Sequence, residues 1–300
     1  MTKIISLFHD YTFLVVALGC ALFGIVSGVF GCFAVLRRRS LLGDGISHAA
    51  LPGVALAFLL TGNRGTEVLL LGAFIFGLAA AFIMSGLEKH SRLKPDSAIA
   101  LVMSVFFGFG LVLLTFLQKQ PDANHAGISR FIYGQASTLL LRDVVFIAVG
   151  GGLILLVITM LWKEFKLLVF DAEFAKSAGF PTGRLNLLLL LLTVSAIVIG
   201  LQAVGALLMS AMLVSPAVAA RQWTERFGVM AVLASVFGAL SGVAGAFISS
   251  VAPKIPTGPS IVVAVSFIAV FSLLFAPHRG VLAKIIKRYK LRRMHNESRI

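Results

Sequence analysis

The stretch YTFLVVALGCALFGIVSGVFGCFAVL, Tyr11–Leu36, contains no charged side chain. A helix of this length is long enough to cross the hydrocarbon core of a bilayer, which needs roughly 20 apolar residues. Lys3, His9 and Asp10 precede it, and no small-residue cleavage site follows a short hydrophobic core. The stretch therefore predicts a first membrane span and not a removable signal peptide.

Apolar runs of similar length follow along the whole chain. The composition agrees, because 59% of the residues are hydrophobic, 13% are charged and the mean hydropathy is +1.00. These values exclude an ordinary soluble protein and predict an all-α polytopic membrane protein. The further spans are expected at residues 46–63, 68–87, 97–118, 144–162, 227–253 and 255–278.

One apolar segment, residues 185–220, is ambiguous in length. As a single helix it would be about 54 Å long, which is too long for one crossing and short for two. Gly200, Gln202 and Gly205 offer a break that would give two helices of about 16 residues each. We therefore expect about nine spans, or eight if the segment crosses once.

The loop charges decide between these counts, because cytoplasmic loops collect Lys and Arg. Nine spans place the basic loops and the basic C-terminus inside, with the N-terminus outside. This predicts a single transmembrane domain, 1–278, and a basic cytoplasmic tail, 279–300, that contacts anionic lipids and not nucleic acid. Residues 128–141 are expected to form an interfacial helix on the outer face. The inside loops are residues 37–39, 88–96, 163–184 and 221–226.

The pair Asp44 and His48, in GDGISHAALPG, is the candidate metal site. A spacing of four puts both side chains on one helical face, about 6 Å apart. A carboxylate and an imidazole together are half a site for a divalent transition metal. The alternative is that Asp44 caps a helix at the membrane interface and that His48 packs against a polar neighbour.

Small residues surround this pair, which indicates that another helix can approach it closely. A second copy of the chain, related by a twofold axis, would supply another Asp and another His and complete a four-ligand cage. Pro52 cannot donate to the carbonyl of His48, so a kink is expected there. The small residues are Gly43, Gly45, Ser47, Ala49, Ala50 and Gly53.

The loop FDAEFAKSAGFPTGRLN, residues 170–186, is the second candidate site. Asp171 and Glu173 alternate with apolar residues, Gly179 stands where a helix C-cap would, and Pro181 follows. A short amphipathic cytoplasmic helix of this kind could dock into a groove of a soluble partner. A solvated turn between two spans is the alternative.

No sequence of the form GxxxxGK[ST] or HExxH occurs, so neither a nucleotide site nor a zinc hydrolase motif is present. The chain is therefore expected to be a transport subunit and not an enzyme, with its energy supplied by a partner or by a gradient. A gradient-driven metal transporter would need further intramembrane acids or histidines for coupling. Apart from Asp44 and His48 the expected spans have no such residues in their interior, which favours a partner over a gradient as the source of energy.

Four segments in the same order resemble the membrane permease subunit of the bacterial ABC-type manganese/zinc/iron uptake family. They are VLRRRSLLGDGISHAALPGVALAF (35–58), RFIYGQ (130–135), FDAEFAKSAG (170–179) and VGALLMSAMLVSPAVAA (204–220). The resemblance covers residues 13–277.

This resemblance implies a type II ABC importer-like permease in the bacterial cell membrane. It implies a homodimer that sits on a cytoplasmic ABC ATPase dimer and receives its ion from an extracytoplasmic metal-binding protein. Asp44 and His48 would coordinate the ion in transit, and Asp171, Glu173 and Gly179 would belong to the helix that couples to the ATPase. No cofactor is bound permanently; the cargo is expected to be manganese, with zinc or iron as the other candidates.

Overall fold

The computed structural model describes residues 10–62, 65–119, 136, 139–251, 255–277 and 279–285. Every regular element in these ranges is a helix, so the predicted all-α class is confirmed. The RFIYGQ segment and most of the expected interfacial helix at 128–141 lie outside the described residues. The same is true of the basic tail beyond Ile285.

Helix α2 (Tyr11–Leu36) is the first span, with the predicted bounds, and lies in the centre of the protein. Asp10 caps it by accepting a hydrogen bond from the backbone N–H of Thr12 at 3.0 Å. Its glycines allow close backbone contact with α13 (Phe227–Val251): a Cβ added at Gly24 would lie 2.3 Å from the carbonyl oxygen of Gly238. Glycine is therefore required at this crossing.

Eight segments of the described chain are long and apolar enough to cross a membrane. Besides α2 and α13 they are α3 (Leu42–Ala49) with α4 (Leu51–Thr61), α5 (Thr66–His90), α6 (Pro95–Gln118), α8 (Leu141–Met160), α11 (Thr182–Val204) and α14 (Thr257–Phe275). This is the lower of the two expected counts. Helix α12 (Ala206–Trp223) is a separate helix of 18 residues that contains Pro216 and carries Arg221 in its last turn.

The expected break in residues 185–220 is present at Gly205, where φ is +83°. Glycine adopts this backbone conformation without the steric cost that a Cβ imposes. The expected helix length was wrong, because α11 begins at Thr182 and has 23 residues. The polar residues at its start extend the helix beyond the apolar segment, and the apolar run alone did not include them.

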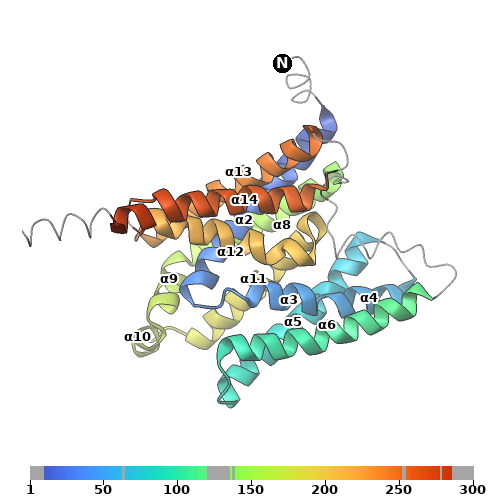
Figure 1. The fold of residues 1–300 in the computed structure, drawn as a ribbon. Coiled ribbons are helices and arrows are strands. Elements are labelled where there is room, and N and C mark those ends of the chain that lie inside the picture. Colours follow the sequence, from blue (N-terminus) through green and yellow to red (C-terminus); the bar gives the residue numbers. More distant parts are fainter. Residues whose placement is uncertain are drawn as a thin grey trace, which may run out of the picture.

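The helices form two groups (Figure 1). One group packs around α2 and contains α8, α12, α13 and α14, and the other contains α3, α4, α5 and α6. Helix α11 packs on both α2 and α5, and α12 packs on α3, so these two helices join the groups. The short helices α9 (Trp162–Phe170) and α10 (Ala172–Ser177) lie together at one end.

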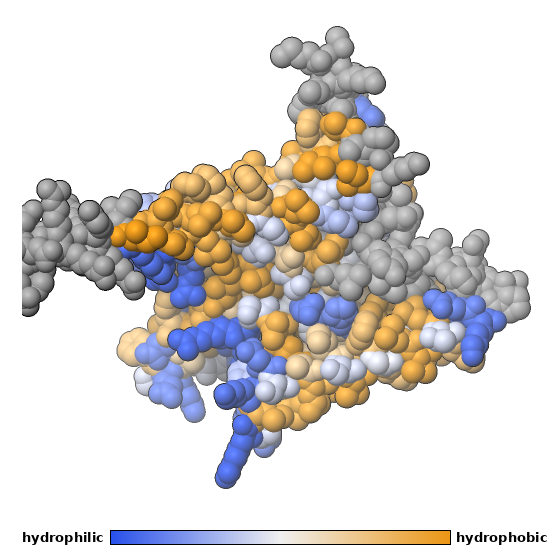
Figure 2. Space-filling view, in the orientation of Figure 1, coloured by the Kyte–Doolittle hydropathy of each residue, from blue (hydrophilic) through white to orange (hydrophobic). Residues whose placement is uncertain are grey.

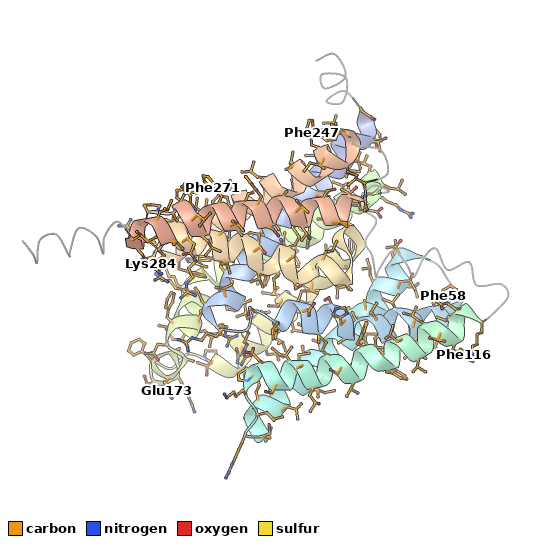
Figure 3. All side chains as sticks on the ribbon, viewed as in Figure 1. Phe58, Phe116, Glu173, Phe247, Phe271 and Lys284 are labelled. Carbon is orange, nitrogen blue, oxygen red and sulfur yellow. The ribbon has the colours of Figure 1, made fainter. Side chains whose placement is uncertain are left out.

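The surface has the polarity expected of a membrane protein. Apolar residues cover most of the visible helices in Figure 2, and hydrophilic residues gather towards the ends. Glu173 and Lys284 lie at one end of the protein and Phe58 and Phe116 at the opposite end (Figure 3). The helices therefore span between two polar ends.

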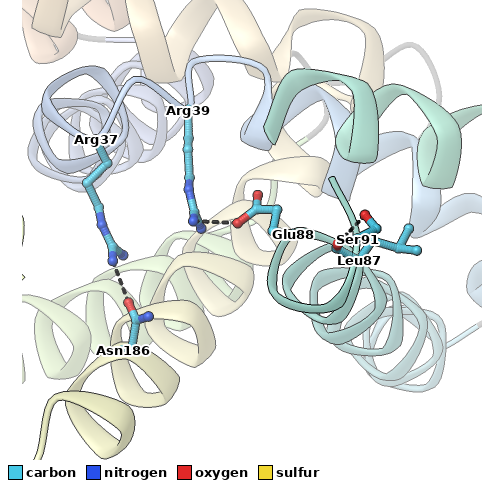
Figure 4. Close-up of polar contacts among 6 residues, drawn as sticks. All are labelled: Arg37, Arg39, Leu87, Glu88, Ser91 and Asn186. Carbon is cyan, nitrogen blue, oxygen red and sulfur yellow. Dashed lines mark hydrogen bonds and ion pairs between the residues drawn. The ribbon is translucent and has the colours of Figure 1, made fainter. Parts of the chain in front are cut away.

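Two polar contacts hold the loop between α2 and α3 (Figure 4). Arg37 donates to Asn186 of α11 at 2.5 Å, and Arg39 pairs with Glu88 of α5 at 2.5 Å. Burial lowers the pKa of Arg37 to about 10, and Arg39 adds to this effect. The loop that leads into α3 is thus attached to α11 and to α5, at the end that carries α10.

Candidate functional site

Asp44 and His48 lie on one face of α3, as their spacing predicts. The Nε2 atom of His48 is 3.5 Å from the Oδ1 atom of Asp44, and the two side chains are 14% and 29% exposed. Helix α3 ends at Ala49 and α4 begins at Leu51, directly before Pro52. The interruption predicted around Pro52 is therefore present. Both candidate ligands therefore sit on a short helix at a break.

The separation of the two side chains suits shared coordination of one ion. Two ligands at about 2.1 Å from a tetrahedral metal are about 3.4 Å apart, close to the spacing in this pair. The other ring nitrogen of His48, Nδ1, is buried without a hydrogen-bond partner among the described residues. The ring of Phe107, in α6, packs edge-on against the imidazole with centroids 4.8 Å apart.

One part of the alternative interpretation, that Asp44 caps a helix, does not fit this geometry. Leu41 is the N-cap of α3 and Asp44 lies inside the first turn, so Asp44 is not the helix cap. The other part, a polar neighbour for His48, stays open: the imidazole packs against the ring of Phe107 and has Asp44 beside it. The described residues contain no group of three or more His, Cys, Asp or Glu side chains that could hold a metal. Within these residues, the pair could supply at most two ligands to an ion.

The small residues around the pair pack inside the chain and not towards a second copy. A Cβ added at Gly45 would lie 2.6 Å from the side chain of Ile99, and one at Gly53 would lie 2.2 Å from the carbonyl oxygen of Gly72. Ala49 and Ala50 are fully buried. The expectation that these residues admit a second protomer was wrong for this reason.

The face of α3 that remains partly open carries Leu41, Asp44 and His48. The buried Ser47 lies on a neighbouring side of α3, and its hydroxyl lies 3.2 Å from the carbonyl oxygen of Ala206, the first residue of α12. Sequence reasoning counted Ser47 only as a small residue, and no pattern in the sequence indicates its partner. The contact joins the candidate metal helix to the break at Gly205.

The loop at residues 170–186, which the sequence predicts to be cytoplasmic, contains a capped helix. The Oδ1 atom of Asp171 accepts a hydrogen bond from the backbone N–H of Phe174 at 2.8 Å and caps the start of α10. Gly179 follows α10 with φ of +85°, as predicted for a C-cap glycine. The N–H groups of Gly179 and Phe180 donate to the carbonyls of Lys176 and Ala175, which is the Schellman pattern.

Three phenylalanines are exposed in this loop, although it lies among charged residues. Phe170, Phe174 and Phe180 are 59%, 57% and 38% exposed. Glu173 is exposed beside them. Sequence reasoning concentrated on the acidic residues and missed these aromatics; three phenylalanines in one polar loop were the available signal. The exposed rings make the loop a candidate docking surface.

Comparisons with known proteins agree with this architecture. The model of the ABC 3 transport family matches residues 9–276. The zinc transport system membrane protein TroC of Treponema pallidum is 46% identical, over 99% of this chain and 100% of that protein. The manganese transport system membrane protein MntC of Bacillus subtilis is 44% identical, over 99% of this chain and 68% of that protein.

A solved structure has the same fold. PsaBC from Streptococcus pneumoniae in complex with Fab has a TM-score of 0.80 and 32% identity, over 92% of this chain and 96% of that chain. The family match, the relatives and the eight candidate spans lead to one conclusion: this chain is a multi-pass cell-membrane protein of the ABC 3 transport family, a permease subunit of ABC transporters.

Proposed function

We propose that the chain is the permease of an ATP-driven importer for divalent transition-metal ions, with manganese as the favoured cargo and zinc or iron as alternatives. The observation that carries the proposal is the pair Asp44 and His48, 3.5 Å apart on the partly open face of α3. Within a membrane span, such a pair is costly unless it serves the cargo.

The ligand chemistry fits this class of ion. A carboxylate oxygen and an imidazole nitrogen serve manganese, iron and zinc, and zinc generally binds such a pair more tightly than manganese. The relatives are named for zinc or manganese. The preference for manganese comes from the likeness of RFIYGQ and DGISHAALPG to manganese importers.

A homodimer would complete the shell. Each protomer offers one carboxylate and one imidazole, whereas a transition ion usually takes four or more ligands. The open face of α3, with Leu41 beside the pair, is the side that a twofold-related copy could share. An extracytoplasmic metal-binding protein would deliver the ion to this path.

The energy would come from a separate cytoplasmic ATPase dimer that contacts α10. The Asp171 cap and the Schellman turn at Gly179 hold α10 in one conformation, and the exposed ring of Phe174 and the carboxylate of Glu173 are available to a partner. A preorganised helix with an exposed aromatic residue can transmit force without first being ordered.

The experiment is reconstitution of the chain with the ATPase and metal-binding protein of its own transport system in proteoliposomes. Uptake of manganese or zinc should require ATP and persist when ion gradients are dissipated. Uptake that needs a proton or sodium gradient but no ATP would contradict the proposal and support the gradient-driven alternative.

A further inference from the structure

A groove lies between α5 and α8 at the end of the protein opposite α10. Both helices pack on α11 but have little contact with each other. Gly77 of α5 lies against Val194, and Gly150 of α8 lies against Ile199, so α11 forms the floor between two walls. Phe58, shortly before α5 begins, lies at the end opposite Glu173 (Figure 3).

The outer part of the groove carries charged side chains. It is a cavity of about 520 Å³ lined by Glu67 in the first turn of α5 and by Arg142 and Asp143 at the start of α8. The Arg142 side chain is 73% exposed, and its Nε atom is 3.8 Å from Oδ1 of Asp143. The Oδ2 atom of Asp143 accepts from the backbone N–H of Leu140 at 3.0 Å, so this carboxylate caps α8.

Glu67 differs from Asp143 in its partners. No described residue forms an ion pair or hydrogen bond with the Glu67 carboxylate, whereas Asp143 has both kinds of partner. This cavity therefore presents an anionic group on one wall and an exposed guanidinium on the other. A zwitterionic ligand would complement both charges.

The groove continues as an apolar channel along the same two walls. A second cavity of about 330 Å³ shares three residues with the first, namely Glu67, Leu70 and Phe146, and reaches Phe74, Val198 and Ile199. From Thr66 to Phe74 the two cavities together extend about 12 Å along α5. A ligand with a charged head and a long apolar chain fits this sequence of surfaces.

We propose that this groove binds a phospholipid whose headgroup carries a phosphate and a primary amine, as phosphatidylethanolamine does. Arg142 binds the phosphate by charge-assisted hydrogen bonds, and Glu67 accepts from the ammonium group. One acyl chain lies between Leu70, Phe74 and Phe146 on the floor of α11.

Other lipid headgroups match the two charges less well. A phosphatidylglycerol headgroup carries the same phosphate charge but a neutral glycerol, so it has no cation for Glu67. A phosphatidylcholine headgroup carries a quaternary ammonium that cannot donate a hydrogen bond. The primary amine is therefore the group that the Glu67 wall selects. The inference does not depend on the transported ion.

The test measures lipid retention by the purified transporter. The full complex is stripped in mild detergent, given equimolar phosphatidylethanolamine, phosphatidylglycerol and phosphatidylcholine, and examined by native mass spectrometry. The parent should retain phosphatidylethanolamine preferentially. Glu67→Gln and Arg142→Gln should each retain it about tenfold less, as expected for loss of one charge-assisted hydrogen bond.

A matched control is Lys119→Gln, which removes a positive charge just after α6, outside this groove. This variant should retain phosphatidylethanolamine like the parent, and thermal melting of each variant shows that it is folded. Equal retention of the three lipids by the parent would overturn the proposal. So would parental retention in both groove variants, or occupation of the groove by another protein segment that leaves no lipid bound.

Discussion

Arg39 and Glu88 form an ion pair between the loop that precedes α3 and the end of α5, with Nη2 and Oε2 2.5 Å apart. Their side chains are 25% and 12% exposed, so the pair is mostly shielded from water. Arg37, which lies in the same loop as Arg39, donates a hydrogen bond to Asn186 of α11 (Figure 4). The position of the candidate metal helix therefore depends on polar contacts at the end that carries α10 as well as on apolar packing.

Removing one partner of this ion pair should destabilise the protein. Arg39→Gln or Glu88→Gln leaves a shielded charge unpaired, at a cost of about 1–3 kcal/mol. Thermal melting of the purified complex should show both losses, and the double variant should lose less than the two single losses added together. Simple additivity would contradict a direct interaction between the two side chains.

Asp44→Ala and His48→Ala should each reduce metal accumulation by at least about tenfold, because each removes a ligand from every protomer of a shared site. Cellular manganese and zinc are measured by elemental analysis, with membrane content checked by immunoblot. Asp96→Ala and His90→Ala are controls, since both residues are exposed and neither belongs to the pair. Near-normal uptake by both Asp44 and His48 variants would rule out the site.

Gly179→Val should uncouple ATP hydrolysis from transport. The residue has φ of +85°, which costs a β-branched side chain about 1–2 kcal/mol or more, although no atom lies near its Cβ position. Gly183→Val is the control, because Gly183 also has open space around it but lies within α11. ATPase activity and metal uptake are measured on the same purified complex. If the Gly179→Val variant takes up as much metal per ATP hydrolysed as the parent, the loop does not couple hydrolysis to transport.

Reversing the charge at Glu173 tests the docking surface without removing the helix cap. Glu173→Lys should weaken co-purification of the ATPase, whereas Asp171→Lys should also lose the cap of α10, worth about 1 kcal/mol. The two variants are compared by pull-down of the ATPase and by melting. Normal ATPase recovery with Glu173→Lys would exclude this carboxylate from the interface.

The dimer is tested at the open face of α3. Leu41→Cys, in a background without Cys20 and Cys32, should crosslink two copies in native membranes through bifunctional thiol reagents of about 10 Å, if the pair faces the axis. Leu41 is 45% exposed, whereas Ala49 is fully buried, so Ala49→Cys should remain unlinked. Crosslinks at Ala49 and none at Leu41 would contradict the prediction that the face with Leu41 is turned towards the second copy.

Local patterns were sufficient for several features of this protein. The absence of charge over Tyr11–Leu36 predicts α2 with its observed bounds, since a span needs only length and apolarity. Gly205 and Gly179 both have positive φ, as the breaks predicted there require. The contact between Asp44 and His48 follows from helical spacing alone.

Contacts between distant segments were decided by the tertiary structure. The small residues around His48 could serve a neighbouring helix of the same chain or of a second copy, and only the packing of α5, α6 and α12 shows that they serve the chain itself. The contact of Ser47 with Ala206, the ion pair of Arg39 with Glu88 and the cavity between Glu67 and Arg142 likewise join residues far apart in sequence. Hydropathy and spacing describe each helix separately, whereas the rotation of a helix and the choice of its neighbours depend on how all the side chains pack together.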